Sequence, residues 1–532
     1  MDGIIYLDCL AGIGRSGPKD ELVAWRTETL LDEMEHCGIH GALVYHNVAR
    51  EYDPAYGNRM LAAEVAKSPR LVSCWVVMPH VTDDMPPGGQ LVGQMLASGV
   101  RAARMYPKLH TYAFDEATCG ELLDALERED ILLSIDVGQT SFDELAAVAV
   151  RHRGLPILMT GCVWTQTRLI YPVMDRCPNI HIEFSTFQAN YAMERFTARY
   201  GAQRLLFGTD ALLKSPGAAK AFVDYAELAP DDRAKVAGGN LARLLRLERL
   251  PEEYSASASE KDGEILRRVK QGRPLDHVTV IDSHAHMVHD GGQGVGFMPM
   301  PQGDAQDMIR RYRRIGVRRF AASAWIGVWA DWEEGNRIIR SAMERYPDEV
   351  IGYATLDPNY LAPDEFERWM HVVHDEWGFK GIKPYHPRVR VPYNSPRYDP
   401  WYAYGNDHRL FCLLHSSGGG FLKEAADIAA RYPEVTFLLA HSGGDFPTAR
   451  ERIPLARERE NVYLEITLTP VTYGVIEYMV REVGAEKVLF GTDAPMRDPI
   501  PQLGWTCYAR LSDAELVLIL GANMERILAR CR

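Results

Sequence analysis

Five side chains in the second half of the chain have the types and spacing of a metal site. His284 and His286 end an apolar run, and side chains two residues apart on a strand point to the same face. His415, His441 and Asp493 each end another apolar run. Imidazole and carboxylate groups bind zinc and similar divalent ions, with a position left open for water. A single histidine is more often structural, but these five together predict a metal site.

The elements that must position these residues alternate regularly along the chain. Short apolar or β-branched segments are separated by amphipathic segments such as 304–316 and 421–433. Repeated strand–helix pairs over roughly 250 residues predict a (β/α)8 barrel, which carries its active site at the C-terminal strand ends. The predicted strands are 278–286, 318–325, 350–357, 378–385, 410–417, 436–443, 461–467 and 487–494.

The chain also repeats itself. The string LFGTDA occurs at 206–211 and again at 489–494, and the segment 239–247 is similar to 522–530 at the same separation. We therefore predict an α/β fold of two tandem (β/α)8 TIM barrels. The predicted boundaries are 1–250 for the first barrel, 251–276 for a linker and 277–532 for the second barrel.

The first copy lacks the histidines. On the common template, each site residue of the second copy has a counterpart in the first. The pairs are His284 with Leu10, His286 with Gly12, Lys383 with Arg104, His415 with Asp136, His441 with Gly161 and Asp493 with Asp210. Leucine and glycine cannot bind a metal through side chains, so we expect a degenerate barrel without metal ligands. Asp210 is expected to pair with Arg104 or another nearby donor. A structural role, packing on the second barrel as one protomer packs on another, is the first hypothesis; a ligand-sensing pocket is the alternative.

The ordered motifs resemble a known family. IDSHAH at 281–286, GFKGIKPYHP at 378–387, LLHSSGG at 413–419, AHSGG at 440–444 and FGTDAP at 490–495 resemble the amidohydrolase superfamily, in its amidohydrolase-2 branch. This branch contains hydrolases, including lactonases, and non-oxidative decarboxylases. The resemblance implies one divalent metal ion, zinc before manganese or iron. The implied metal ligands are His284, His286, His415 and Asp493.

The resemblance also implies catalytic roles in the second barrel. Asp493 would accept a proton from the metal-bound water, and His441 would polarise the scissile carbonyl or help to orient the nucleophile. Lys383 would be a carboxylated bridge between two metals, a contact for a substrate carboxylate, or one member of an ordinary ion pair.

Several further residues suggest a substrate site. Arg388 could bind an acidic substrate through its planar guanidinium, or could lie in a solvated loop. Trp325 and Trp329 could wall an apolar pocket, or could simply pack within the fold. The Gly/Met/Pro-rich insert 289–304 could serve as a lid or be a plain surface loop.

Composition narrows the classes of partner. The net charge of −13 disfavours nucleic acid and anionic membranes, and no apolar run is long enough to span a bilayer. The nine irregularly spaced cysteines and an N-terminal stretch without a basic leader favour a reducing compartment, so we expect a cytoplasmic protein. The expected partner is a small-molecule substrate, and homo-oligomerisation stays open.

These inferences predict a metal-dependent hydrolase that cleaves an amide or an ester or lactone bond of a small, carboxylated molecule. The alternatives are a metal-dependent non-oxidative decarboxylase of the same family and a non-catalytic two-barrel scaffold. His284 favours the hydrolase, because several decarboxylases of the resembling branch carry glutamate at this position while others retain histidine.

Overall fold

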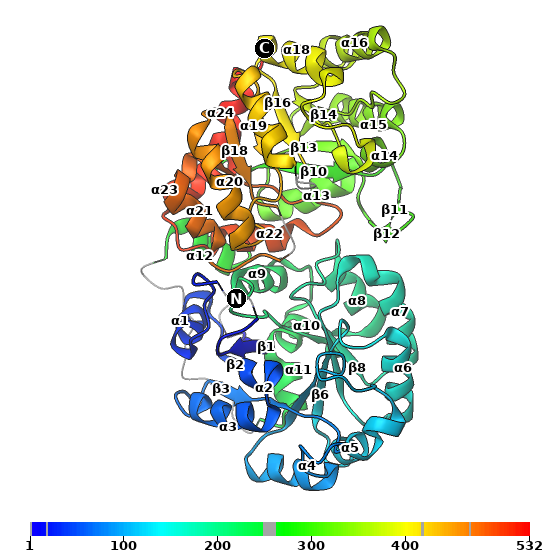
Figure 1. Cartoon of the computed structure of the whole chain (residues 1–532), viewed down its shortest axis with the longest axis vertical. Helices are drawn as coiled ribbons and strands as arrows, with labels where there is room; N and C mark the ends of the chain where they lie inside the picture. The colour runs from blue at the N-terminus through cyan, green and yellow to red at the C-terminus, as the bar shows by residue number, and fades with distance from the viewer. Residues whose placement is uncertain (1–2, 18–19, 248–261, 416–419, 468–469) are drawn as a thin grey trace. The chain divides into compact units, whose positions relative to one another are not determined.

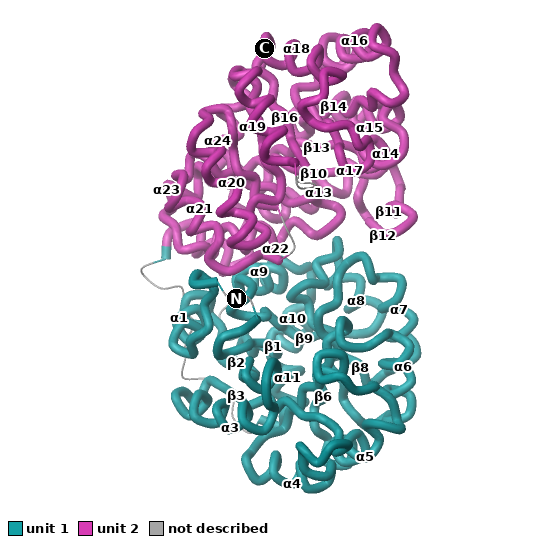
Figure 2. Tube along the Cα trace, in the orientation of Figure 1, with its two compact units in different colours: residues 1–262 teal, residues 263–532 magenta. Residues whose placement is uncertain are grey.

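The computed structural model describes residues 3–17, 20–247, 262–415, 420–467 and 470–532. The chain divides into two compact units, residues 1–262 and 263–532, and each contains strands surrounded by helices (Figures 1 and 2). The predicted linker, 251–276, lies outside the described residues from 251 to 261. Its C-terminal part forms helix α12 (Glu264–Lys270), which belongs to the second unit and buries Ile265 and Val269.

The second unit is a closed parallel barrel. Its strands lie in chain order, and the segment after the last strand returns to the first: Ser283 N donates to Phe490 O at 3.0 Å, and Asp493 N donates to His284 O at 2.7 Å. All eight predicted strands are confirmed. They are β10 (Ile281–Met287), β13 (Arg319–Ala324), β14 (Val350–Ala354), β15 (Gly381–Ile382), β16 (Phe411–Leu414), β17 (Thr436–Leu439), β18 (Val462–Glu465) and β19 (Val488–Leu489).

The first unit repeats this barrel. Cys74 divides its third strand position into two short strands, and Cys74 N donates to Val44 O at 2.8 Å. The ring closes where Asp210 N donates to Leu10 O at 2.8 Å. The two tandem barrels are thereby confirmed. The strands are β1 (Leu7–Ile13), β2 (Gly41–His46), β3 (Leu71–Ser73), β4 (Trp75–Val76), β5 (Ala102–Met105), β6 (Leu132–Asp136), β7 (Ile157–Thr160), β8 (Ile180–Glu183) and β9 (Leu205–Leu206).

Helices surround both rings, and their ends follow local sequence signals. Helix α13 (Ala305–Ile315) begins where the Asp304 side chain accepts a hydrogen bond from Asp307 N and ends at Gly316, whose φ is 91°. The other helices of the second unit are α14 (Trp325–Trp329), α15 (Trp332–Arg345), α16 (Pro363–His371), α17 (His386–Val389), α18 (Asp399–His408), α19 (Phe421–Arg431), α20 (Phe446–Glu458), α21 (Val475–Val483), α22 (Pro499–Cys507), α23 (Asp513–Val517) and α24 (Asn523–Arg530).

The first unit has a matching set. Its helices are α1 (Thr27–Cys37), α2 (Asn47–Glu51), α3 (Pro54–Val65), α4 (Gly88–Ala97), α5 (Glu116–Arg128), α6 (Phe142–Arg151), α7 (Thr167–Arg176), α8 (Ala192–Tyr200), α9 (Pro216–Tyr225), α10 (Pro230–Ala234) and α11 (Asn240–Leu244). Across the described residues, every helix falls short of the length or hydrophobicity that a bilayer span needs.

Each barrel has its own core, which fixes the strands that carry the site. In the second barrel Phe411 and Leu438 pack in one buried cluster with Ile527 of α24, and the first barrel has a corresponding cluster around Leu206 and Leu241 of α11. Burial of each such side chain stabilises the fold by about 1.5–3 kcal/mol. The insert between β10 and α13 contains a short antiparallel hairpin, β11 (Gly294–Val295) and β12 (Met298–Pro299).

Candidate metal centre

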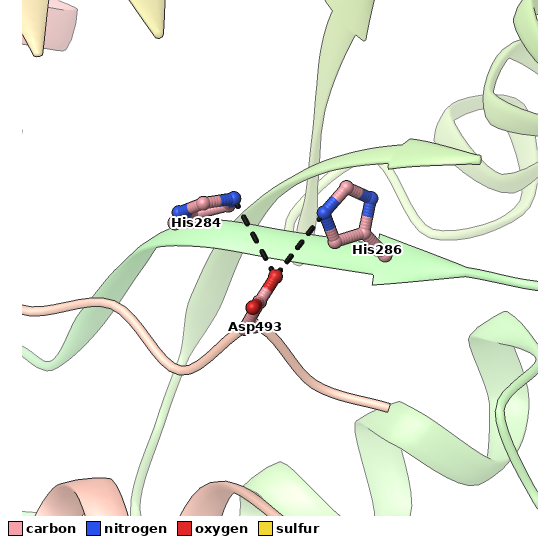
Figure 3. A group of neighbouring side chains, drawn as sticks. All are labelled: His284, His286 and Asp493. Carbon is pink, nitrogen blue, oxygen red and sulfur yellow. Dashed lines mark ion pairs between the residues drawn. The ribbon is translucent and has the colours of Figure 1, made fainter. Parts of the chain in front are cut away.

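Closure of the second barrel brings Asp493 against the HxH pair of β10. Asp493 Oδ1 lies 3.2 Å from His286 Nε2 and 3.6 Å from His284 Nε2, and the three side chains point toward one another (Figure 3). Their ligand atoms all lie within 4.8 Å of one another, and all three residues are buried. Three of the four predicted metal ligands therefore converge at the C-terminal mouth of the barrel.

The two remaining histidines lie beside this group. His441 packs against His284 with ring centroids 5.1 Å apart, and its Nε2 lies 3.2 Å from Nδ1 of His415. His415, the fourth predicted ligand, contacts the group through His441 and is not among the described residues whose ligand atoms fall within the 4.8 Å sets. All five residues named from the sequence thus occupy one mouth, with His415 at its edge.

The tautomer of His441 follows from its partner. His441 Nδ1 lies 2.7 Å from Thr467 O, and a carbonyl oxygen can only accept, so Nδ1 carries the hydrogen. Nε2 then carries a lone pair. This arrangement favours orientation of a nucleophile over polarisation of a carbonyl, because polarisation requires a hydrogen-bond donor.

Glu465 is a site residue that the sequence reasoning missed. It ends β18, is fully buried, and its Oε2 lies 2.9 Å from His284 Nδ1. The carboxylate accepts the Nδ1 hydrogen, so His284 Nε2 carries the lone pair and lies near both Asp493 and Lys383. Glu183 occupies the equivalent place in the first barrel, so a glutamate present in both copies was the available signal.

The protonation states suit metal binding. Burial holds the pKa of His286 below its ordinary value and lowers the pKa of His441 to about 4, so both rings are neutral near pH 7. Burial alone would raise the pKa of Asp493, but His284, His286 and Arg497 outweigh it and keep the carboxylate ionised. Neutral imidazoles and an ionised carboxylate are the forms that coordinate a divalent ion.

Lys383 lies directly beside this group. It follows β15, is 1% exposed, and places Nζ 3.1 Å from His284 Nε2. Burial lowers its pKa to about 8. Within the described residues no carboxylate forms an ion pair with Lys383, so the expected ordinary ion pair is not formed. A role toward a metal or a substrate stays a prediction.

An aromatic wall flanks the group. The Trp325 ring stacks on His286 at 4.6 Å, and Trp329 contacts both Trp325 and Phe297. The Arg388 guanidinium lies 3.5 Å from the centroid of Trp329. Trp325 and Trp329 thus lie near the predicted ligands, and the hairpin insert adds Phe297 to them.

The mouth of the first barrel is filled by its own side chains. A Cβ on Gly12 would lie 3.0 Å from the Tyr45 hydroxyl, and a Cβ on Gly161 would lie 2.3 Å from Asp136 Oδ2. Arg104 is buried and donates to the Tyr106 hydroxyl at 2.6 Å. The space that holds histidine rings in the second barrel is thus occupied by a tyrosine and a carboxylate in the first.

Of the two expected partners of Asp210, Arg104 or another nearby donor, the structure shows the second. Asp210 pairs with Lys214, four residues later, whereas Arg104 also donates to the hydroxyls of Ser134 and Thr160. The chain turns after Asp210, and Lys214 N donates to Asp210 O at 3.1 Å, so the Lys214 side chain reaches the Asp210 carboxylate locally. The second barrel repeats this spacing in the pair of Asp493 and Arg497.

One further group of ligand-type residues lies in the first unit. Asp124, Glu127 and His152 come within 4.8 Å of one another between α5 and the end of α6. The two ring nitrogens of His152 lie 2.9 Å from Glu127 and 3.0 Å from Glu116. Both nitrogens are therefore used by carboxylates of the protein, which indicates a structural ion-pair network.

Comparison with known proteins agrees with the motifs. A family model described as amidohydrolase matches residues 28–247 and 281–530, once in each barrel. This chain belongs to the amidohydrolase family. As a member of that family it is a metal-dependent enzyme, and its candidate ligands lie in the second barrel. No curated protein sequence matches the chain.

Solved structures similar to this chain cover about half of it. A TIM-barrel protein of Bordetella bronchiseptica is 18% identical over 48% of this chain and 99% of its own, with a TM-score of 0.39. The 2,6-dihydroxybenzoate decarboxylase of Rhizobium is 15% identical over 47% and 99%, with a TM-score of 0.39. The 5-carboxyvanillate decarboxylase of Sphingomonas paucimobilis is 14% identical over 47% and 99%, again at 0.39.

Proposed function

We propose that the second barrel is a metal-dependent hydrolase that cleaves an amide, ester or lactone bond of a small, carboxylated molecule. The observation that carries this proposal is the convergence of His284, His286 and Asp493 at the barrel mouth. Burying an ionised carboxylate costs free energy, and a non-catalytic scaffold would gain no function from it. The cluster therefore supports catalysis over a purely structural role.

The donor set fits one divalent ion. His284, His286 and Asp493 would hold it, with His415 completing the set, and zinc is expected before manganese or iron. A bound ion of this kind supplies Lewis acidity that brings the pKa of a water molecule toward neutrality. Glu465 and Ser323 support the arrangement, because they contact the Nδ1 atoms of His284 and His286 and so direct both Nε2 atoms to Asp493.

The side chains around the ion divide the remaining work. Asp493 accepts a hydrogen bond from Arg497 at Oδ2, and its Oδ1 faces the histidines. It can therefore accept a proton from the attacking water and return it to the leaving group. His441 Nε2 carries the lone pair that would orient that water, and in the structure this atom lies 3.2 Å from His415 Nδ1. Arg388, exposed beside Trp329, offers a planar guanidinium to a substrate carboxylate.

Metal content and product analysis test this proposal. We expect about one divalent ion per chain, since structural and catalytic sites of this ligand type hold one ion each. We expect His284→Ala to lose the ion, and Asp493→Asn to lower kcat by about 10²–10⁴-fold on a panel of lactones, esters and N-acylated amino acids. Asp210→Asn, at the equivalent place in the first barrel, is the matched control and should change neither readout.

Two results would contradict the proposal. A chain that stays free of metal in metal-replete medium would exclude the metalloenzyme. Metal-dependent release of carbon dioxide from aromatic acids, without hydrolysis of any ester, lactone or amide, would assign the site to decarboxylation instead.

A further inference from the structure

A pocket of about 610 Å³ lies at the base of the first barrel, on the side opposite to its mouth. It is bordered by the end of α7, the first residues of β8, the segment before β9, and α11. His181, Arg199, Arg204 and Arg243 line it, together with a single carboxylate, Asp175.

The positive charges in this pocket exceed the negative ones. Asp175 is already committed to Arg199, whose Nε donates to it at 3.1 Å. The guanidinium of Arg204 donates hydrogen bonds to neutral backbone carbonyls, those of Met174, Cys177 and Ile180. Arg243 is exposed, and its guanidinium forms no hydrogen bond or ion pair with any residue that the structure describes. Two guanidinium charges therefore have no carboxylate partner at this wall.

His181 adds an unused polar atom. The residue is 7% exposed, and its Nδ1 is buried without a hydrogen-bond partner among the described residues. Burial, followed by the charges of Arg243 and Arg204, lowers its pKa to about 3. Burial is the larger cause and the two guanidinium charges act in the same direction, so the ring is neutral near pH 7.

The second barrel offers an internal comparison, because the same three positions exist there. His181, Arg204 and Arg243 correspond to Tyr463, Lys487 and Arg526. Lys487 donates to Arg459 O at 2.8 Å and lies 5.1 Å from the Tyr463 ring centroid.

Arg526 differs from its counterpart Arg243. It donates to Glu486 O at 3.3 Å and to Asn523 Oδ1 at 3.1 Å, so the second barrel uses this guanidinium within its own fold. The first barrel leaves the equivalent guanidinium of Arg243 available. A cation needed only for stability would be expected to behave alike in both copies.

We propose that this pocket of the first barrel binds the phosphate group of a small molecule, with Arg243 as the direct ligand and Arg199 and Arg204 as supporting charges. The guanidinium fork matches the spacing of phosphate oxygens and forms short, charge-assisted hydrogen bonds. The chain as a whole carries a net charge of −13, so a locally positive pocket departs from its general surface. The site is independent of the metal centre in the second barrel.

Calorimetric titration of the full-length protein tests the proposal with three probes: inorganic phosphate, glycerol 3-phosphate and acetate, at constant ionic strength. We expect saturable binding of a phosphate probe and no saturable binding of acetate. Tighter binding of glycerol 3-phosphate identifies a phosphate ester as the ligand, and tighter binding of inorganic phosphate identifies the free ion. Arg243→Gln should raise the Kd about tenfold.

Three controls locate the binding. Arg526→Gln, the matched change in the second barrel, should leave the Kd unchanged, and so should His284→Ala, which removes the metal centre as a competing phosphate site. His181→Tyr introduces the larger side chain of the second barrel at the wall of the pocket and should also raise the Kd. Because Arg243 is exposed, its variant is expected to fold normally. Absence of saturable phosphate binding, or equal loss in Arg243→Gln and Arg526→Gln, would overturn the proposal.

Discussion

At the scale of single residues, Glu465 determines which ring nitrogen of His284 is available to a metal. Its Oε2 lies 2.9 Å from His284 Nδ1, and its other oxygen accepts from Thr467 N at 2.7 Å. The carboxylate is therefore fixed from two sides, and it fixes both the tautomer and the orientation of the ring. Burial raises the pKa of Glu465 to about 8, so its charge is sensitive to what binds next to it.

We predict that Glu465→Gln weakens metal binding without removing any ligand. Loss of a carboxylate behind a metal-binding histidine typically costs 10–100-fold in metal affinity, and we expect a change within about that range. Competition with a chelating indicator measures it. Glu183→Gln, the equivalent change in the first barrel, is the control, and equal metal affinity of all three proteins would disprove the role of Glu465.

The metal ligands could be predicted from the sequence, but the role of Glu465 behind His284 could not be predicted from residue type alone. His284, His286, His415, His441 and Asp493 stand out because they end apolar runs. Glu465 ends such a run as well, yet glutamate at the end of a strand is common and its importance depends on which ring the barrel brings beside it.

At the scale of elements, the two barrels keep the same backbone at the mouth while their side chains differ. Asp210 and Asp493 have φ values of 56° and 61°, and Gly161 and His441 have values of 70° and 61°. Residues other than glycine are uncommon in this left-handed region and are found where surrounding structure enforces it. The turns after these strands are therefore properties of the fold, and the two barrels differ in the side chains that these turns carry.

We predict that Gly161→Ala destabilises the first barrel more than Gly99→Ala does. Both glycines have positive φ, 70° and 71°, but a Cβ at 161 would meet Asp136 Oδ2 at 2.3 Å whereas a Cβ at 99 meets nothing within 4 Å. The conformational cost common to both is about 1–2 kcal/mol, and overpacking adds about 1–3 kcal/mol at 161. Urea unfolding of the two variants measures the difference, and equal destabilisation would contradict the crowding described here.

Element packing also predicts a pH dependence. His374, in the segment after α16, receives a hydrogen bond from Trp401 Nε1 at 2.7 Å, and its Nδ1 lies 2.8 Å from Phe379 O. Burial lowers its pKa to about 4. Because the pKa in the folded state lies below that of an unfolded histidine, the neutral ring stabilises the fold above about pH 6.5, and this stabilisation is lost as pH falls toward 4.

We expect this one histidine to remove about 2 kcal/mol of stability between pH 7 and pH 5. Unfolding of wild type and His374→Gln at the two pH values measures it. The variant should be less stable at pH 7 and should lose about 2 kcal/mol less on acidification. A parallel loss in both proteins would show that His374 does not titrate in this range.

At the scale of the whole molecule, the residues that the structure describes form two barrels with separate cores, and the candidate metal centre lies in the second. The duplication could be predicted because LFGTDA recurs and a second, similar pair of segments has the same separation, and because eight alternating segments in the second half define a barrel. The filling of the first mouth could not be predicted. It depends on Tyr45 and Arg104 reaching across from neighbouring strands, which residue types alone do not specify.

We predict two components in calorimetric unfolding, of which a divalent metal shifts only one. A ligand that binds the folded state at 100 times its Kd stabilises that state by about 2.7 kcal/mol. We expect this shift in the component that belongs to residues 263–532, and we expect it to vanish in His284→Ala. A metal shift that persists in His284→Ala would place the strongest metal site elsewhere in the chain.

The crowding at Gly12 and Gly161 has a consequence for the history of the protein. When a histidine is lost from such a mouth, neighbouring side chains can take its volume, and the Tyr45 hydroxyl now stands where a side chain at Gly12 would begin. Introducing a histidine at Gly12 or Gly161 would then meet neighbouring side chains instead of an empty place. Each neighbouring side chain that fills the mouth makes reversal harder. Metal binding in this barrel would therefore need several simultaneous substitutions.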